Sequence, residues 1–375
     1  MSSSVPPTPV EAASPRRRWW PFVLMVVAGL TVTAVGLAAF IQVPYYGISP
    51  GDARSVNDRI TITGAEVYPP EGEQLFVTVG VPRLTALGAV LGWIDPDTDV
   101  VEEERILGDR TPEENREENL QLMTYSKDFA TYVALRELGF PVKVEDGGVT
   151  IDSLCMSGDD PCSQPSPADD VLDAGDLLTA IDGEPVNLPD DIGPAIEGKA
   201  AGDLVEVVFE RDGEEASGEV ALTTSTDGRV ILGIIPNPLP PSTIEFTFPV
   251  DVAIDSGQVG GPSAGLAFTL ALLDELTPGE LTGGVTVAAT GTIDPNGTVG
   301  EIGGIRQKTV AVQRTGAKLF LVPASLAPIA AQEAAGSGLE VAGVADLDDA
   351  LEALATLGGN ALALGTPGAS VPPPS

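Results

Sequence analysis

The sequence has no histidine among its 375 residues, and this absence removes whole classes of chemistry. A Ser-His-Asp triad, a Cys-His nucleophile and an HExxH zinc site all require an imidazole, so none of them can operate in this chain. Any serine nucleophile must therefore take its base from a lysine, a carboxylate or an N-terminal amine.

Two further motifs are missing. The sequence has no Gly-Lys-Thr/Ser phosphate loop, which argues against an internal ATP motor, and no D-x-D-x-D-G calcium loop with a terminal glutamate. We therefore expect neither a cofactor nor a metal site.

Basic residues are scarce, with 19 Lys and Arg against 55 Asp and Glu, which gives a net charge of −36. Such a surface repels nucleic acid and anionic lipid, so we expect no nucleic-acid partner. The chain is long enough for two or three domains, and 43% hydrophobic residues suffice to build their cores.

An uncharged apolar run at 19–41 follows three arginines at 16–18. Its roughly 23 residues would cross a bilayer core of ~30 Å, and the positive-inside rule places 1–18 in the cytoplasm. The sequence thus predicts a single-pass cell-membrane protein with its C-terminal domains extracytoplasmic. A cleaved signal peptide is the alternative, but the run exceeds an h-region of about 7 to 15 residues and no convincing A-x-A site follows it.

The only two cysteines, Cys155 and Cys162, flank a turn that contains glycine and proline. In an oxidising exterior compartment they would form a short disulfide loop. Two free thiols are the alternative.

The predicted exterior segment at 42–135 contains strand-like runs, then an exposed charged stretch at 102–118. Residues 120–139 have helical spacing, and Gly139 is a stop signal for the helix. The candidate core positions of this helix are Met123, Phe129, Val133 and Leu138.

The next module, at 136–223, contains LGF at 138–140, VTIDSL, SPADDVLDAGDLLTAIDGEPV and GDLVEVVFERDG. Two of its apolar runs end in Asp-Gly turns, as β-strands do. These pieces resemble a PDZ domain, which binds a peptide by adding it to a sheet edge. The resemblance assigns peptide binding to Leu138, Gly139 and Phe140. Alternatively, Gly139 is a helix C-cap and Phe140 a core residue.

Ser263 lies in GGPSAGLAF and opens an almost wholly apolar run of three turns. This pattern predicts a buried helix with Ser263 at its N-terminus, where unsatisfied N–H groups and the helix dipole can stabilise an oxyanion. Serine is also a favoured N-cap residue, so a purely structural role is the alternative.

Lys308 lies on a helix predicted at about 305–316, after a Gly-Gly turn. At ~100° per residue it falls only ~40° from Val312, on the inward side of the helix. A lysine there must snorkel, pair with an acid or lose its hydration, and desolvation would lower its pKa toward that of a general base.

Four motifs in order, GGPSAGLAF, LTGG, ATGTI and GEIGGIRQK, resemble the proteolytic domain of Lon proteases, here at 228–358. The resemblance implies a Ser-Lys dyad in which Ser263 is the nucleophile and Lys308 the base. It also implies that Thr290 helps to hold the lysine, and that the N–H groups of Gly261 and Ser263 bind the oxyanion. Lon proteases often have an acidic residue where this chain has Gly260.

These expectations combine into an α+β fold class: an N-terminal transmembrane helix, a PDZ-like β domain and a Lon-type proteolytic α/β domain, followed by a disordered tail at 359–375. This order resembles membrane-anchored bacterial PDZ and Lon-like peptidases. It implies an ATP-independent serine endopeptidase that acts on peptides or unfolded proteins, as a homo-oligomer, hexamer or trimer. A non-enzymatic PDZ-type peptide-binding or chaperone-like factor on a Lon-type scaffold is the alternative.

Overall fold

A computed structural model describes residues 19–108, 110–154, 165–225, 228–237 and 243–360. The described residues divide into two units, 19–47 with 81–106, and 48–80 with 107–360. The division splits the segment predicted at 42–135, because the chain leaves the second unit after Gly80 and returns at Leu107.

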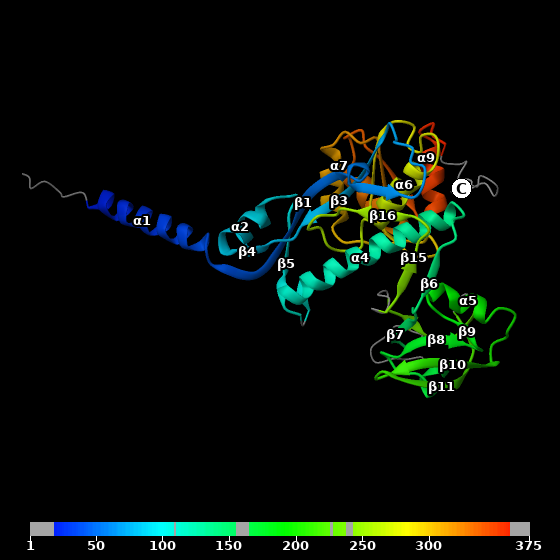
Figure 1. The fold of residues 1–375 in the computed structure, drawn as a ribbon. Helices are drawn as coiled ribbons and strands as arrows, with labels where there is room; N and C mark the ends of the chain where they lie inside the picture. The colour runs from blue at the N-terminus through cyan, green and yellow to red at the C-terminus, as the bar shows by residue number, and fades with distance from the viewer. Residues whose placement is uncertain (1–18, 109, 155–164, 226–227, 238–242, 361–375) are drawn as a thin grey trace, which may run out of the picture. The chain divides into compact units, whose positions relative to one another are not determined.

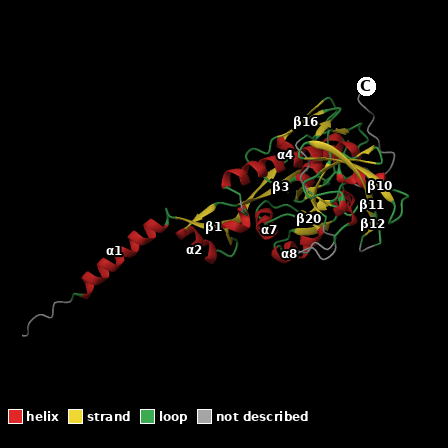
Figure 2. Cartoon of the chain, turned by 90° about the horizontal axis from the view of Figure 1, so that it is seen from below, coloured by secondary structure: helices red, strands yellow, loops and turns green. Residues whose placement is uncertain are grey.

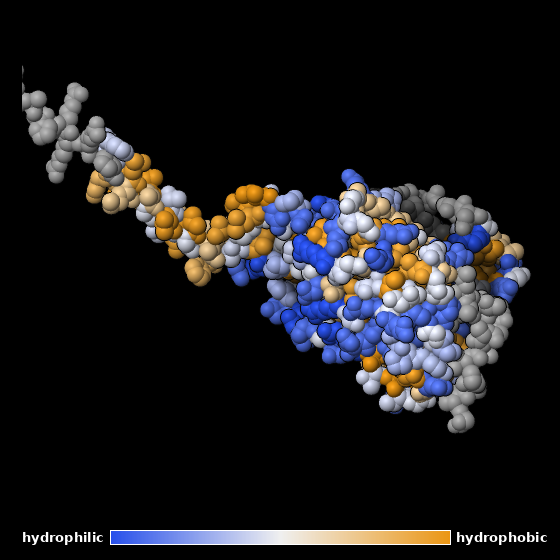
Figure 3. Space-filling view, turned by 90° about the horizontal axis from the view of Figure 1, so that it is seen from above, coloured by the Kyte–Doolittle hydropathy of each residue, from blue (hydrophilic) through white to orange (hydrophobic). Residues whose placement is uncertain are grey.

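The first unit combines one long helix, α1 (Trp20–Ala38), with shorter helices and strands (Figure 1). Thr85 caps α2 (Ala86–Ile94) by accepting a hydrogen bond from the Gly88 N–H at 3.0 Å. The ring of Tyr45 packs edge to face against that of Trp93. Apolar side chains lie exposed along the first helix (Figure 3). Its elements are α1 (Trp20–Ala38), the start of β1 (Gln42–Ser55), β4 (Arg83–Thr85), α2 (Ala86–Ile94), β5 (Asp99–Glu102) and most of α3 (Glu103–Leu107).

The membrane anchor predicted at 19–41 was wrong. The helix ends at Ala38, and a strand begins at Gln42, so the apolar run is not helical throughout. Among the described residues, no helix has both the length and the apolar character needed to span a bilayer. The transmembrane helix of the predicted fold class and the single-pass localisation are therefore not supported. The predicted cytoplasmic tail, 1–18, lies outside the described residues.

The second unit contains a sheet in the order β21-β20-β17-β3-β1 (Figure 1). The first three pairings are parallel, and β1 joins β3 antiparallel through Ser49–Ser55. Its other strands are β3 (Glu73–Gly80), β17 (Thr286–Ala289), β20 (Leu319–Pro323) and β21 (Glu340–Val344). The helices are α4 (Pro112–Glu137), α6 (Gly265–Leu276), α7 (Ile305–Gln313), α8 (Ala327–Glu333) and α9 (Leu347–Ala355).

Alternating side chains of this sheet build two cores, because successive residues of a strand point to opposite faces. Val287 and Ala289 pack into the core that includes α4, α6 and α9, whereas Ala288 packs into the core that includes α7 and α8. Figure 2 shows α4 and α7 on different sides of β3. The sheet therefore lies between two helical layers, and α6 and α7 approach it from opposite faces.

A second sheet, in the order β11-β10-β8-β7-β14, has a core of its own. Asp-Gly pairs with positive φ make two of its tight turns, at 182–183 and 212–213, as the sequence predicted. The elements are β7 (Val149–Ser153), β8 (Leu177–Ile181), β9 (Glu184–Pro185), α5 (Ile192–Ala195), β10 (Leu204–Arg211), β11 (Glu214–Ala221) and β14 (Ile235–Pro236).

Four antiparallel strand pairs complete the described part of the second unit. They are β2 (Ile60–Thr63) with β16 (Asp251–Ile254), β6 (Lys143–Glu145) with β15 (Glu245–Thr247), β12 (Thr223–Thr224) with β13 (Val230–Ile231), and β18 (Thr292–Ile293) with β19 (Val299–Gly300). Two of these pairs join segments more than 90 residues apart, so they fix distant parts of the chain to each other.

The C-terminal half of α6 buries two carboxyl groups. Burial raises the pKa of Asp274 to about 6 and that of Glu275 to about 7. The Leu281 N–H and the Gln74 side chain donate to the two oxygens of Asp274 at 2.8 and 2.9 Å. Folding favours the protonated form of both carboxyl groups, because their pKa values are higher in the folded than in the unfolded protein. Their contribution to the free energy of unfolding is therefore fully present below the pKa values of the unfolded chain and is lost as the pH rises through about 6 to 7.

We expect Asp274→Asn to remove part of this pH dependence. Between pH 5 and pH 8, the free energy of unfolding should move in favour of the variant by about 1–2 kcal/mol, because asparagine has no proton to lose. Urea titrations followed by circular dichroism at several pH values measure the difference. Glu352→Gln, on an exposed position of α9, is the control. A difference between Asp274→Asn and wild type that stays constant with pH would contradict the prediction.

Candidate active site

Ser263 lies two residues before the first residue of α6, at the end of a glycine-containing loop. Gly261 in this loop has a φ of 88°, a left-handed value that favours glycine. Ala264 is the N-cap residue, and no side chain caps the helix. The Ser263 hydroxyl therefore does not cap the helix. The residue is partly exposed.

Lys308 lies on α7 and points inward. The helix follows Gly303 and Gly304; Gly304 has a φ of 70°, and a Cβ there would lie only 2.8 Å from the Val79 side chain. Lys308 is 2% exposed, and its Nζ lies 2.7 Å from the Ser263 Oγ. The two helices thus bring together side chains 45 positions apart in the sequence.

Burial lowers the pKa of the Lys308 ammonium to about 7. An amine in an apolar environment loses the hydration that stabilises its charge, and none of the ion pairs found among the described residues includes Lys308. Around and above neutral pH, a large fraction of the amine is therefore uncharged and can accept a proton from the Ser263 hydroxyl.

Thr290 orients the amine. It directly follows β17, is completely buried, and its Oγ1 donates to the Ser263 carbonyl oxygen at 3.1 Å. Because its single hydrogen is used there, Oγ1 accepts from the Lys308 Nζ at 3.0 Å. An N–H of the uncharged amine directed at Thr290 leaves the nitrogen lone pair available for the Ser263 Oγ–H.

The backbone N–H groups of the loop differ in their partners. The Gly261 N–H, predicted to bind the oxyanion, donates to the Asn119 carbonyl at 2.7 Å, so that role requires this bond to break. Within the described part of the chain, no acceptor is found for the N–H of Ser263 or of Ala264. N–H donors without a partner at a helix N-terminus can stabilise a developing negative charge. The geometry is therefore compatible with the prediction that the Ser263 N–H binds the oxyanion.

The structure places the predicted peptide-binding residues away from the second sheet. Leu138 and Phe140 are buried in the core that includes α6, and Gly139 follows the end of α4 with a φ of 76°. Their packing is that of a helix end and its core neighbours, so peptide binding by these three residues stays a prediction. Cys155 and Cys162 lie outside the described residues, as does the predicted disulfide.

Sequence reasoning missed two residues that contact the loop carrying Ser263, Asn119 and Ser126 of α4. Neither belongs to a recognisable motif. Each contacts a residue about 140 positions away in the sequence, so no local pattern indicates the contact. In the described ranges, no group of three or more acidic or cysteine side chains could hold a metal ion.

Comparison with known proteins identifies the surrounding domain. Residues 246–356 match the family model of the Lon protease (S16) C-terminal proteolytic domain. The Lon protease of Phenylobacterium zucineum (strain HLK1) is 34% identical over 123 residues, which is 33% of this chain and 14% of that protein. The Lon protease of Desulfatibacillum aliphaticivorans is 35% identical over 78 residues, 20% of this chain and 9% of that protein. The chain therefore spans only a small part of these curated relatives.

Residues 137–222 match the PDZ domain model. A PDZ domain of the SdrC-like protein from Listeria innocua aligns with 24% of this chain and 96% of its own, at 26% identity and a TM-score of 0.21. A solution structure from Geobacillus thermodenitrificans aligns with 24% of this chain and 98% of its own, at 32% identity and a TM-score of 0.20. By the two family models, the chain contains a PDZ domain at 137–222 and a Lon-type serine peptidase proteolytic domain at 246–356.

Proposed function

We propose that the protein is an ATP-independent serine endopeptidase that uses a Ser263–Lys308 dyad. The observation that carries the proposal is the 2.7 Å contact between the Lys308 Nζ and the Ser263 Oγ, made by a lysine with a pKa lowered to about 7. The absence of histidine leaves lysine as the base within reach of the serine.

The geometry supports a two-step reaction. Uncharged Lys308 takes the Ser263 hydroxyl proton while Oγ attacks the peptide carbonyl carbon, and the resulting oxyanion is held by free N–H groups. The lysine gives this proton to the leaving amine, and the C–N bond breaks to leave an acyl-enzyme. A water then attacks the ester with Lys308 again as the base, and the proton returns to Ser263.

The PDZ domain is proposed to bind peptide or unfolded-protein substrates through a sheet edge. Both short strands at the start of this domain are already paired. The strand β7 pairs with β14, and β6 pairs with β15, both from the segment that leads into the proteolytic domain. Because β7 lies between β8 and β14, a peptide that adds to β7 must displace one of these two strands. The homo-oligomer, hexamer or trimer, stays a prediction.

Fluorophosphonate labelling of the full chain, followed by intact mass, tests the dyad. We expect one adduct, at Ser263, with a rate that rises with pH through an apparent pKa of about 7, because only uncharged Lys308 activates the hydroxyl. Lys308→Ala should lose this labelling.

Ser337→Ala is the matched control, because its hydroxyl contacts only nearby backbone groups: it donates to the Ala334 carbonyl and accepts from the Leu339 N–H. No labelling of folded wild-type protein at any pH, combined with saturable peptide binding, would instead favour the non-enzymatic binding factor.

A further inference from the structure

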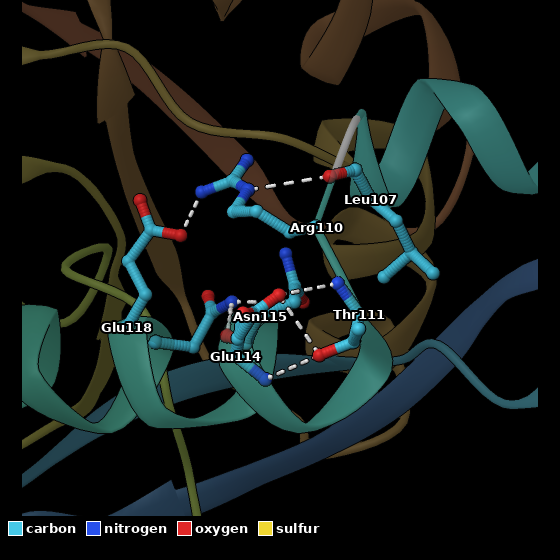
Figure 4. A network of polar contacts seen from close by, with 7 residues as sticks. Leu107, Arg110, Thr111, Glu114, Asn115 and Glu118 are labelled. Carbon is cyan, nitrogen blue, oxygen red and sulfur yellow. Dashed lines mark hydrogen bonds and ion pairs between the residues drawn. The ribbon is translucent and has the colours of Figure 1, made fainter.

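The loop that carries Ser263 is held by α4, a helix that precedes the PDZ domain in sequence. The start of α4 is fixed by a reciprocal cap, in which the Glu114 N–H donates to Thr111 Oγ1 at 3.2 Å and the Thr111 N–H donates to Glu114 Oε2 at 2.8 Å (Figure 4). An ion pair between Arg110 and Glu118 joins the preceding turn to the helix. These contacts fix the first turns of α4, from which the helix contacts the loop that carries Ser263.

One face of α4 holds the catalytic loop. Arg116 Nη2 donates to the Gln258 side-chain oxygen at 2.6 Å, and the Asn119 carbonyl accepts the Gly261 N–H at 2.7 Å. The approach is close, since a Cβ on Gly260 would lie 3.0 Å from the Asn119 Cβ. A side chain at position 260 would therefore crowd α4, and the Asn119 atoms would have to shift by a few tenths of an ångström to admit it.

Ser126, farther along the same face, makes the contact nearest to the nucleophile. It is 4% exposed, and its Oγ donates to the Pro262 carbonyl oxygen at 2.9 Å. In a planar trans peptide the C=O and the following N–H point in opposite directions. The Pro262 carbonyl, which also accepts the Gly265 N–H at 3.3 Å, is thus turned toward Ser126, and the Ser263 N–H points away from α4. This N–H is one of the two in the loop for which no acceptor is found among the described residues.

We propose that Ser126 is a positioning residue for the peptidase reaction. It acts through the Pro262–Ser263 peptide plane and aims the Ser263 N–H at the oxyanion of the tetrahedral intermediate. This inference rests on the proposed function. It adds a residue outside the matched proteolytic domain to the machinery of that domain.

The test compares Ser126→Ala with wild type in the full chain on an internally quenched peptide that the wild type cleaves. We expect kcat to fall about 10- to 100-fold with KM nearly unchanged, since misdirecting an oxyanion donor costs less than the 10²–10³ lost when a donor is removed. The affinity for a peptide boronate should fall by the same factor, because a boron hydroxyl occupies the oxyanion position. The apparent pKa of fluorophosphonate inactivation should stay unchanged, because Lys308 is untouched.

Two other variants separate positioning from folding. Thr131→Val removes a buried hydroxyl of α4 that donates only to the Lys127 carbonyl, and it should leave kcat unchanged. Ser126→Cys keeps a weak donor of similar size and should show an intermediate loss; it replaces the alanine variant if that variant does not fold.

A Ser126→Ala enzyme with kcat within twofold of wild type, or with boronate affinity unchanged, would overturn the inference while wild-type labelling at Ser263 still supports the peptidase. If wild type neither cleaves nor reacts at Ser263, the proposed function fails and this inference fails with it.

Discussion

Replacing Lys308 with methionine is expected to abolish cleavage of unfolded protein, with kcat/KM reduced by at least about 10³-fold. Methionine fills a similar volume but cannot accept the Ser263 proton. Because the lysine is almost fully buried without an acidic partner among the described residues, methionine should not lower the free energy of unfolding. Lost turnover in a protein at least as stable as wild type would separate chemistry from folding.

The measurement is the initial rate of cleavage of a fluorescein-labelled casein, with stability followed by circular dichroism. Ser263→Ala should be equally inactive, and the double variant no worse, because the members of one catalytic unit are not additive. For wild type, kcat/KM should rise with pH through about 7 as Lys308 loses its proton. Retention of a tenth of the wild-type rate by the methionine variant would exclude Lys308 as the base.

The largest expected effect on stability is at Phe268. Its side chain is fully buried on α6, and its ring centroid lies 5.6 Å from that of Phe76 on β3 at an interplanar angle of 54°. Phe268→Ala should lower the free energy of unfolding by about 3–5 kcal/mol, from the lost burial, the cavity and the lost ring pair. Urea denaturation followed by circular dichroism measures the change.

Phe268→Leu is the control, since it keeps most of the apolar volume and should cost only about 1 kcal/mol. A loss below about 1 kcal/mol for the alanine variant would mean that the core closes around the cavity, contrary to the close packing expected between α6 and the sheet. Because α6 begins two residues after Ser263, the alanine variant should also label more slowly with fluorophosphonate.

Local pattern predicted some elements of this fold well. The apolar run after Ser263 predicted a buried helix, and α6 spans Gly265–Leu276 with every residue buried. The angular position of Lys308 predicted an inward side chain, and the structure buries it. In both cases the information lies within one helix, where a period of 3.6 residues decides which side chains face the core.

Other features depend on partners far away in the sequence. Most described residues of the charged stretch at 102–118 are exposed, as predicted, but the helix expected at 120–139 already begins within that stretch, at Pro112 behind the Thr111 cap. The bond between Gly261 and Asn119 joins residues 142 positions apart, and no local pattern encodes it. The apolar run at 19–41 had the composition of a membrane span, but the helix that forms covers only Trp20–Ala38.

The pairing of β6 with β15 changes how the PDZ domain relates to the rest of the chain. Glu145 lies opposite Glu245, so the chain leaves and re-enters at neighbouring positions of one antiparallel ladder. The intervening 146–244 therefore form, in topological terms, a greatly enlarged hairpin loop. Since the entropy of closing a loop grows only slowly with its length, such an insertion costs the host fold little. The same two strands joined by a tight turn would leave the topology of the proteolytic domain intact, so this ladder is a position at which one inserted domain can replace another.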